Sequence, residues 1–346
     1  MKFMAAKNET TVLALTLVIT LGLLGIVYWW LSTSGIIAGS FGGKGTWQVK
    51  QSNYQTFSQV PKVPLGLFSY GGSTTWAPIR KDVDPAVQTV FPEFQLRYTD
   101  PTIGAPGSGS GIKMLIDNQL AFSQSSRPIK NEEYQKASKR GFTLREVPVA
   151  LDGIAIAVHP DLNVPGLTVA QIKDIYTGKI TNWKSLGGPD LSITPYSRRL
   201  EEGGTVEFFS DNVLSGEKFG TNVQYIPTTT QALQTVARNN GGIYYASAPE
   251  VVGQCTVKPL PLGKTSDTFV PPYQEPFIPL SECPKQRNQL NAVAFQKNQY
   301  PITRRLFVIV KHEGNSDQQA GEAYANLMLT NQGQELIAKA GFVRIR

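Results

Sequence analysis

The chain has few of the residues that usually bind metal ions or carry nucleophilic chemistry. Its 346 residues include only two cysteines, Cys255 and Cys283, and two histidines, His159 and His312, which are far apart in the sequence. Two cysteines without clustered histidines do not make a metal site of the usual ligand spacing. We therefore expect no metal ion and no other cofactor.

The patterns typical of nucleic-acid and nucleotide binding are also missing. Lysine and arginine total 33 against 26 acidic residues, a formal net charge of +7, but no block of five or more basic residues occurs. Basic residues are not interleaved with aromatic residues at regular spacing, so we expect no nucleic-acid partner. The Gly-x-x-x-x-Gly-Lys-Ser/Thr loop of ATP-binding proteins is absent. The mild positive excess suits a protein that collects anions.

One long apolar segment lies near the N-terminus. Residues 11–31 contain no charged side chain, and about 21 helical residues at 1.5 Å each reach roughly 30 Å, the thickness of a bilayer's hydrocarbon core. Lysines precede this segment and three aromatic residues, 28–30, end it. This pattern favours a cytoplasmic segment at 1–10 and a transmembrane signal anchor at 11–31, with the remainder on the periplasmic side of the cytoplasmic membrane. A cleaved signal peptide that leaves a soluble periplasmic protein is the alternative.

The composition changes after the apolar segment. Residues 32–61 are rich in Gly, Ser, Thr and Gln with few periodic apolar positions, which is typical of a flexible tether. From residue 62 onward, short apolar strands alternate with amphipathic helices. Among them are a nearly continuous apolar strand at 153–158 and a helix at 168–177 that a threonine cap opens. This order predicts an α/β fold with central sheets.

Both cysteines follow the predicted anchor. An oxidising compartment would allow Cys255 and Cys283 to form a disulfide. Such a bond contributes roughly 3 to 4 kcal/mol by restricting the unfolded chain. A pair of buried free thiols is the alternative.

Two glycine-rich loops carry polar groups that suit a small tetrahedral oxyanion. One loop contains Ser108, Gly109 and Ser110 before a predicted helix, and the other joins Arg199 to the run Gly203-Gly204-Thr205. Backbone N–H groups at helix N-termini and hydroxyl donors bind anions of this kind. Each loop alone also has an ordinary interpretation, as a flexible turn or as an arginine that pairs with neighbouring glutamates on the surface.

Longer motifs resemble the periplasmic phosphate-binding proteins of bacterial ABC importers. The most specific is LTVAQIKDIYTGKITNW at 167–183, with GIAIAV at 153–158 and NGGIYY at 240–245 on either side of it. The similarity extends from about residue 65 to the C-terminus. It implies the type II substrate-binding protein fold, with two mixed sheets flanked by helices and a cleft between two lobes. Lobe 1 is then expected at 62–152 with 249–346, and lobe 2 at 153–248.

The resemblance also implies which residues bind the anion. Matched by position, the donors are the Thr75 hydroxyl, the Trp76 backbone N–H, Ser108, Gly109, Ser110, Arg199, Gly203, Gly204 and Thr205. Ser126 stands where these proteins commonly have an aspartate, and Arg127 follows it.

The serine at position 126 affects ligand choice. An aspartate there would accept the proton that phosphate carries near neutral pH and would repel sulfate, whereas Ser126 removes that negative charge. Phosphate and another tetrahedral oxyanion therefore both stay open. Arg127 either faces the cleft and makes it more cationic, or lies on the surface.

The implied function is high-affinity binding of inorganic phosphate without catalysis. The expected protein is a monomer that delivers phosphate to an ABC permease and its ATPase. A membrane-anchored sensor or scavenger of phosphate or another oxyanion is the alternative. An enzyme with Ser108 or Thr75 as nucleophile is disfavoured, because no base or metal cluster accompanies these residues.

Overall fold

The computed structural model describes residues 54–200 and 203–345, except for the side chain of Leu280. The predicted cytoplasmic segment 1–10, the predicted anchor 11–31 and most of the predicted tether lie outside the described residues. Within the described ranges, no helix combines the length and the apolar character needed to cross a bilayer.

The first lobe is built on parallel strands joined by helices. In the sheet, β1 pairs in parallel with β2 and β3, and β11 pairs antiparallel with β3 and β4, giving the order β2-β1-β3-β11-β4. The strands are β1 (Gly66–Gly72), β2 (Phe94–Tyr98), β3 (Phe122–Ser125), the first part of β4 (Thr143–Val158) and β11 (Thr303–His312). The helices are α2 (Ala77–Val90), α3 (Ser108–Ile116), α4 (Asn131–Lys139), α10 (Ser316–Met328) and α11 (Asn331–Lys339), with 3-10 turns η2 (Phe57–Gln59) and η3 (Thr74–Trp76).

The second lobe continues from the same long strand. Its sheet joins the last part of β4 to β8 and β9 in antiparallel pairs, and β6 pairs in parallel with β8 and β7. The strands are β5 (Leu167–Thr168), β6 (Thr194–Ser197), β7 (Gln224–Tyr225), β8 (Gly242–Ser247), β9 (Lys258–Leu260) and β10 (Leu262–Gly263). The helices are α5 (Val169–Tyr176), α6 (Gly204–Asn212), α7 (Thr229–Val236), α8 (Ala248–Val251) and α9 (Ala292–Gln296), with 3-10 turns η4 (Trp183–Leu186) and η6 (Leu280–Glu282).

Local sequence explains why several of these elements form where they do. The predicted strand at 153–158 is the last part of β4, and residues 154–158 are completely buried, as its continuous apolar run requires. The Thr168 hydroxyl accepts a hydrogen bond from the Gln171 backbone N–H and caps α5, which confirms the predicted threonine cap.

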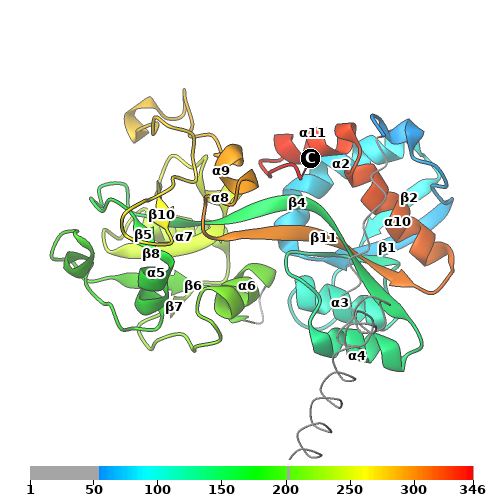
Figure 1. Ribbon diagram of the computed structural model, residues 1–346, viewed down its shortest axis with the longest axis horizontal. Coiled ribbons are helices and arrows are strands. Elements are labelled where there is room, and N and C mark those ends of the chain that lie inside the picture. Colours follow the sequence, from blue (N-terminus) through cyan, green and yellow to red (C-terminus); the bar gives the residue numbers. More distant parts are fainter. Residues whose placement is uncertain (1–53, 201–202, 346) are drawn as a thin grey trace, which may run out of the picture. The chain divides into compact units, whose positions relative to one another are not determined.

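Two strands connect the lobes. β4 runs without interruption from one sheet into the other, and β11 pairs with it from Thr303 opposite Gly153 to His312 opposite Thr143. Figure 1 shows these two strands side by side where the chain passes between the lobes. The predicted α/β fold with two lobes is therefore confirmed, and its two mixed sheets share one strand.

The predicted return of the chain to lobe 1 at residue 249 is wrong. β9 pairs with β4 over residues 156–158, and β10 pairs with β5, so both belong to lobe 2. Val251, Leu260, Phe295 and Tyr300 are buried in the same apolar cluster as the core strands β4 and β8. Lobe 2 therefore spans 153–302, and the chain re-enters lobe 1 only with β11.

The predicted tether also ends earlier than residue 61. Phe57 is completely buried, and its backbone N–H donates to the Gln332 side chain at 2.9 Å. The backbone carbonyls of Tyr54 and Gln55 accept from Asn331 and Gln332 at the start of α11. Residues 54–61 are thus part of lobe 1, because an apolar side chain and paired backbone groups fix them there.

Cys255 and Cys283 form a disulfide, with their Cα atoms 5.7 Å apart and a sequence separation of 28. Residues 255–283 carry few helices and strands, so this covalent bond restricts a segment with little regular backbone pairing.

We expect replacement of both cysteines by serine to lower the free energy of unfolding by about 3 to 4 kcal/mol, the chain-entropy value for a loop of this size. Denaturant unfolding of the variant and of the wild type measures the difference. The wild type kept under a thiol reductant is the matched control and should unfold like the variant. Equal stability of oxidised wild type and variant would contradict the expectation.

Candidate anion-binding site

The N-termini of α3 and α6, one from each lobe, meet at the boundary between the lobes. A Cβ atom built on Gly107, just before α3, would lie 3.4 Å from the Cα of Gly203, just before α6. A Cβ on Gly111 would lie 2.4 Å from the Cα of Gly72 at the end of β1, so glycine lets α3 approach that strand. Two helix N-termini with partial positive charge therefore point into one region.

Buried serine hydroxyls surround this meeting point. Ser73, Ser108 and Ser126 are at most 1% exposed. The Ser73 Oγ donates to Ser126 Oγ at 3.0 Å, and the hydroxyls of Ser108 and Ser126 are 3.2 Å apart. A Cβ built on Gly204 would lie 2.4 Å from Ser108 Oγ and 2.6 Å from Ser126 Oγ. Gly204 of lobe 2 is therefore in direct contact with the serine cluster of lobe 1.

A second polar contact joins the lobes beside the serine cluster. The hydroxyls of Thr75 in lobe 1 and Thr205 in lobe 2 are 3.4 Å apart. The Arg304 Nη2 atom donates to Thr75 Oγ1 at 3.2 Å and to Thr205 Oγ1 at 2.9 Å, and Nη1 donates to the Gly204 carbonyl at 3.3 Å. One guanidinium on β11 thus holds hydroxyls of both lobes.

Asp152 on β4 orients this arginine. The carboxylate of Asp152 and Nη2 of Arg304 are 2.8 Å apart, and both side chains are at most 1% exposed. The Ser247 hydroxyl also donates to Asp152, at 2.6 Å. Burial raises the pKa of Asp152, while Arg304 and Ser247 oppose that shift. Our sequence reasoning missed Arg304, which lies in the same strand as the apolar run 306–310 but before that run begins.

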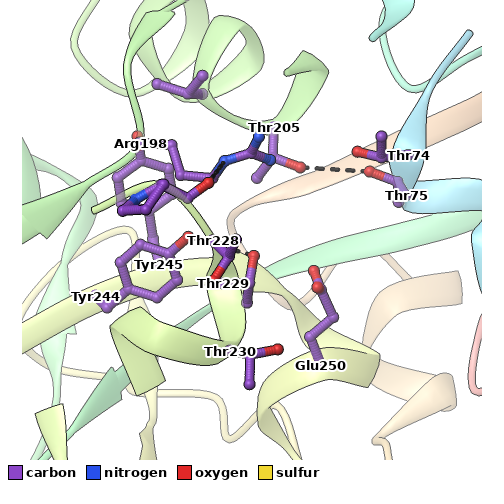
Figure 2. Close-up of a pocket in the computed structure, with 12 residues that line it drawn as sticks. Thr74, Thr75, Arg198, Thr205, Thr228, Thr229, Thr230, Tyr244, Tyr245 and Glu250 are labelled. Carbon is purple, nitrogen blue, oxygen red and sulfur yellow. Dashed lines mark hydrogen bonds between the residues drawn. The ribbon is translucent and has the colours of Figure 1, made fainter. Parts of the chain in front are cut away.

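A cavity of about 240 Å³ opens next to the Thr75–Thr205 contact. Figure 2 shows Arg198, the threonines at the start of α7 and Glu250 arranged around it, with the dashed line joining Thr75 and Thr205. Its lining consists of Thr74, Thr75, Arg198, Thr205, Val206, Pro227, Thr228, Thr229, Thr230, Tyr244, Tyr245 and Glu250. Hydroxyls and one guanidinium give this cavity the donor groups that an oxyanion requires.

The arginine that lines the cavity is Arg198, whereas the predicted Arg199 does not line it, so a role of Arg199 in binding the anion stays a prediction. Arg198 follows β6, lines the cavity and donates from Nε to the Pro227 carbonyl at 3.1 Å. Arg199 is exposed, and its guanidinium carbon lies 5.1 Å from the centroid of the Tyr225 ring. β6 ends at Ser197, so both arginines lie beyond the strand, and in this structure only Arg198 faces the cavity.

Arg127 is neither a free cation in the cleft nor a surface residue. It is 4% exposed and bonds to carboxylates from both lobes. Its Nη2 lies 2.8 Å from Glu133 in α4, and its Nε lies 2.8 Å from Glu207 in α6. Its Nη1 donates to Glu133 and to the Pro128 carbonyl. Arg127 does not line the cavity, and two carboxylates already surround its guanidinium, so its role in binding the anion stays a prediction.

Two further predicted donors have partners elsewhere. The Trp76 backbone N–H bonds to the Ser73 carbonyl at 3.3 Å, and its indole donates to the Ser125 carbonyl, so Trp76 is a buried packing residue. The Ser110 hydroxyl donates to the carbonyls of Ala105 and Gly107 within its own loop.

The remaining predicted residues lie near one another. Thr75 and Thr205 line the cavity, while Ser108, Ser126 and Gly204 form the adjoining contact between the lobes. The glycines on either side complete this region: a Cβ on Gly203 would lie 3.3 Å from Arg198 Nη1, and a Cβ on Gly109 would lie 3.2 Å from Glu207 Oε1. The residues that sequence reasoning missed are Arg304, Arg198, Glu250 and the threonines at 74 and 228–230.

Comparisons with known proteins agree with this architecture. The chain is 27% identical over 278 residues to the phosphate-binding protein PstS of Staphylococcus epidermidis, which covers 79% of this chain and 77% of the relative. A crystal structure from Clostridium perfringens, assigned as a phosphate ABC transporter substrate-binding protein and containing bound phosphate, has 26% identity and a TM-score of 0.64, covering 81% of this chain and 100% of that one.

A third similar protein extends the likeness in fold. An ABC-type phosphate transport receptor from Vibrio cholerae has a TM-score of 0.62 at 21% identity, covering 80% of this chain and 99% of that one. The family model of the PBP superfamily domain matches residues 54–332, which is most of the chain. The protein therefore belongs to the PBP superfamily.

Proposed function

We propose that the protein binds inorganic phosphate with high affinity outside the cytoplasmic membrane and delivers it, without catalysis, to the permease and ATPase of an ABC importer. The observation that carries the proposal is the convergence of Thr75 and Ser108 from lobe 1 with Gly204 and Thr205 from lobe 2 beside a cavity lined by Arg198. Relatives that are named phosphate-binding proteins, one of them with phosphate bound, support the choice of ligand.

The cavity offers three kinds of interaction to a phosphate ion. Arg198 supplies positive charge, Thr75 and Thr205 supply a hydroxyl from each lobe, and Thr228–Thr230 supply hydroxyls near the N-terminus of α7. A bound anion loses its water, and these donors replace the lost hydrogen bonds. Binding therefore favours the arrangement in which the two lobes are together.

We propose that the protein acts on the periplasmic side of the cytoplasmic membrane. The uncharged apolar segment 11–31 supports an anchor that keeps the binding lobes on the periplasmic side of the membrane. The disulfide between Cys255 and Cys283 agrees with an oxidising compartment. We propose that the protein is a monomer, because all the binding groups come from one chain.

The two neighbouring arginines test where the phosphate site lies. We expect Arg198→Ala to weaken phosphate binding about 10- to 100-fold, because a hydrogen bond from a charged donor contributes about 1.5 to 3 kcal/mol. Calorimetric titration of protein freed of bound phosphate gives the dissociation constants. Arg199→Ala removes an equal charge next to it and should change the constant by less than about threefold. A larger loss of affinity in Arg199→Ala than in Arg198→Ala would show that phosphate binds outside this cavity.

The contact between Gly204 and the serine cluster tests the role of lobe closure. A methyl group in Gly204→Ala would overlap Ser108 Oγ and Ser126 Oγ and should hold the lobes apart. We expect phosphate binding to weaken about 5- to 150-fold, because overpacking of this kind costs about 1 to 3 kcal/mol. Titration measures affinity, and small-angle X-ray scattering with and without phosphate measures compaction.

Gly253→Ala is the matched control for this substitution. The nearest heavy atom to a Cβ built on Gly253 is 3.9 Å away, so the added methyl group has room. This variant should bind phosphate and respond to it like the wild type. A Gly204→Ala protein that compacts and binds normally would show that the observed contact is not needed for binding.

A further inference from the structure

Glu250 is a carboxylic acid placed at the cavity, and the function proposed above gives it no role. It belongs to the short helix α8, directly after β8, and it lines the cavity together with Thr75, Thr205 and Arg198. In Figure 2 its carboxyl group points into the space between the threonines at the start of α7 and the Thr75–Thr205 pair. Among the residues that the structure describes, no other acidic side chain lines this cavity.

The groups that face Glu250 come from several elements. Asp152 of β4 carries the same charge, Arg304 of β11 and Arg198 after β6 carry the opposite charge, and the backbone N–H of Ser247 bonds to the Glu250 carboxyl. Tyr245 of β8 also lines the cavity, and burial raises the pKa of its hydroxyl well above 10, so it stays neutral in the physiological range. Among the residues that the structure describes, Glu250 is therefore the acidic group at the cavity whose charge can change.

Its environment sets the pH at which that change occurs. Burial raises the pKa of Glu250 to about 7, and Asp152 adds to this shift while the two arginines oppose it. Below pH 7 the carboxyl is mostly neutral and can donate a hydrogen bond. Above pH 7 it is mostly ionised and can only accept one.

Ser126 cannot take this part. Its hydroxyl is fully buried, it pairs with Ser73 and Ser108, and it carries no charge at any physiological pH. To distinguish oxyanions by their protons, a site needs a negatively charged hydrogen-bond acceptor. Such a group accepts a hydrogen bond from a protonated oxyanion and repels an oxyanion that has no proton. Of the described residues that line the cavity, Glu250 has that property.

We propose that Glu250 is the residue that selects a protonated tetrahedral oxyanion over a fully deprotonated one. This inference rests on the proposed binding of phosphate in the same cavity. Phosphate keeps at least one P–OH group near neutral pH and donates it to the ionised carboxylate. Sulfate has no proton there, so its oxygen atoms face the carboxylate without a hydrogen bond, and sulfate is admitted only when Glu250 itself is neutral.

This role of Glu250 makes the sulfate affinity fall as the pH rises. Sulfate binds the neutral form of Glu250, which is populated below pH 7 and is lost as the pH rises through 7. For one group with this pKa, the apparent sulfate affinity falls about tenfold between pH 6 and pH 8. Sulfate does not titrate in this range, so the change belongs to the protein.

The experiment titrates sodium sulfate and, separately, sodium phosphate into the ligand-free protein at pH 6 and pH 8. For the wild type we expect sulfate to bind about tenfold more weakly at pH 8, while phosphate still binds at both values. For Glu250→Gln, which keeps the shape and removes the titration, sulfate affinity should differ by less than about twofold between the two pH values. It should also exceed the wild-type value at pH 8 by about tenfold.

Glu335→Gln is the matched control. Glu335 is an exposed residue of α11, and this variant removes one negative charge without touching the cavity. It should keep the pH slope of the wild type. The change in sulfate affinity of the wild type between pH 6 and pH 8 is measured without any variant. The inference can therefore be tested even if Glu250→Gln does not fold.

The outcomes separate this inference from the proposed function. Wild-type sulfate affinity that is equal at pH 6 and pH 8, or a Glu250→Gln protein that keeps the wild-type slope, overturns the role of Glu250 while phosphate binding stands. A sulfate slope that disappears in Glu250→Gln, together with no phosphate binding to the wild type, supports the role of Glu250 and overturns phosphate as the ligand.

Discussion

The buried ion pair between Asp152 and Arg304 is the interaction on which the site depends. It lies on the two strands that pass between the lobes, and both partners are almost completely shielded from water. Removing one partner of such a pair leaves an uncompensated buried charge, which costs several kcal/mol. The remaining N–H groups of Arg304 reach Thr75, Thr205 and the Gly204 carbonyl. The connection between the lobes and the inner wall of the cavity are therefore stabilised by the same side chain.

The sequence was sufficient to predict the elements that depend on local pattern. The apolar run in the last part of β4 and the Thr168 cap of α5 each have a short-range physical cause, and both lie where expected. The lobe boundary at 249 failed because it depends on which distant strand accepts β9 and β10. The local sequence pattern of 249–302 does not indicate that β9 pairs with β4 and that β10 pairs with β5.

The site shows the same division between local and distant causes. Ser108, Gly204 and Thr205 could be identified because loops before helices expose donors whatever lies around them. Arg198 and Arg199 are identical neighbours beyond the end of β6, and which of them faces the cavity depends on the direction in which the chain leaves that strand. Arg127 could not be assigned without knowing that Glu207 approaches from the other lobe.

The pairing of β11 with β3 and β4 has a consequence for the order in which the protein assembles. Lobe 2 is one continuous stretch, whereas the sheet of lobe 1 lacks an interior strand until residues 303–312 have been synthesised. Long-range strand pairing of this kind is slow, and unpaired strand edges favour aggregation. We expect the nascent chain to contain a folded lobe 2 and an incompletely folded lobe 1. Chaperones and proteases would compete for this intermediate.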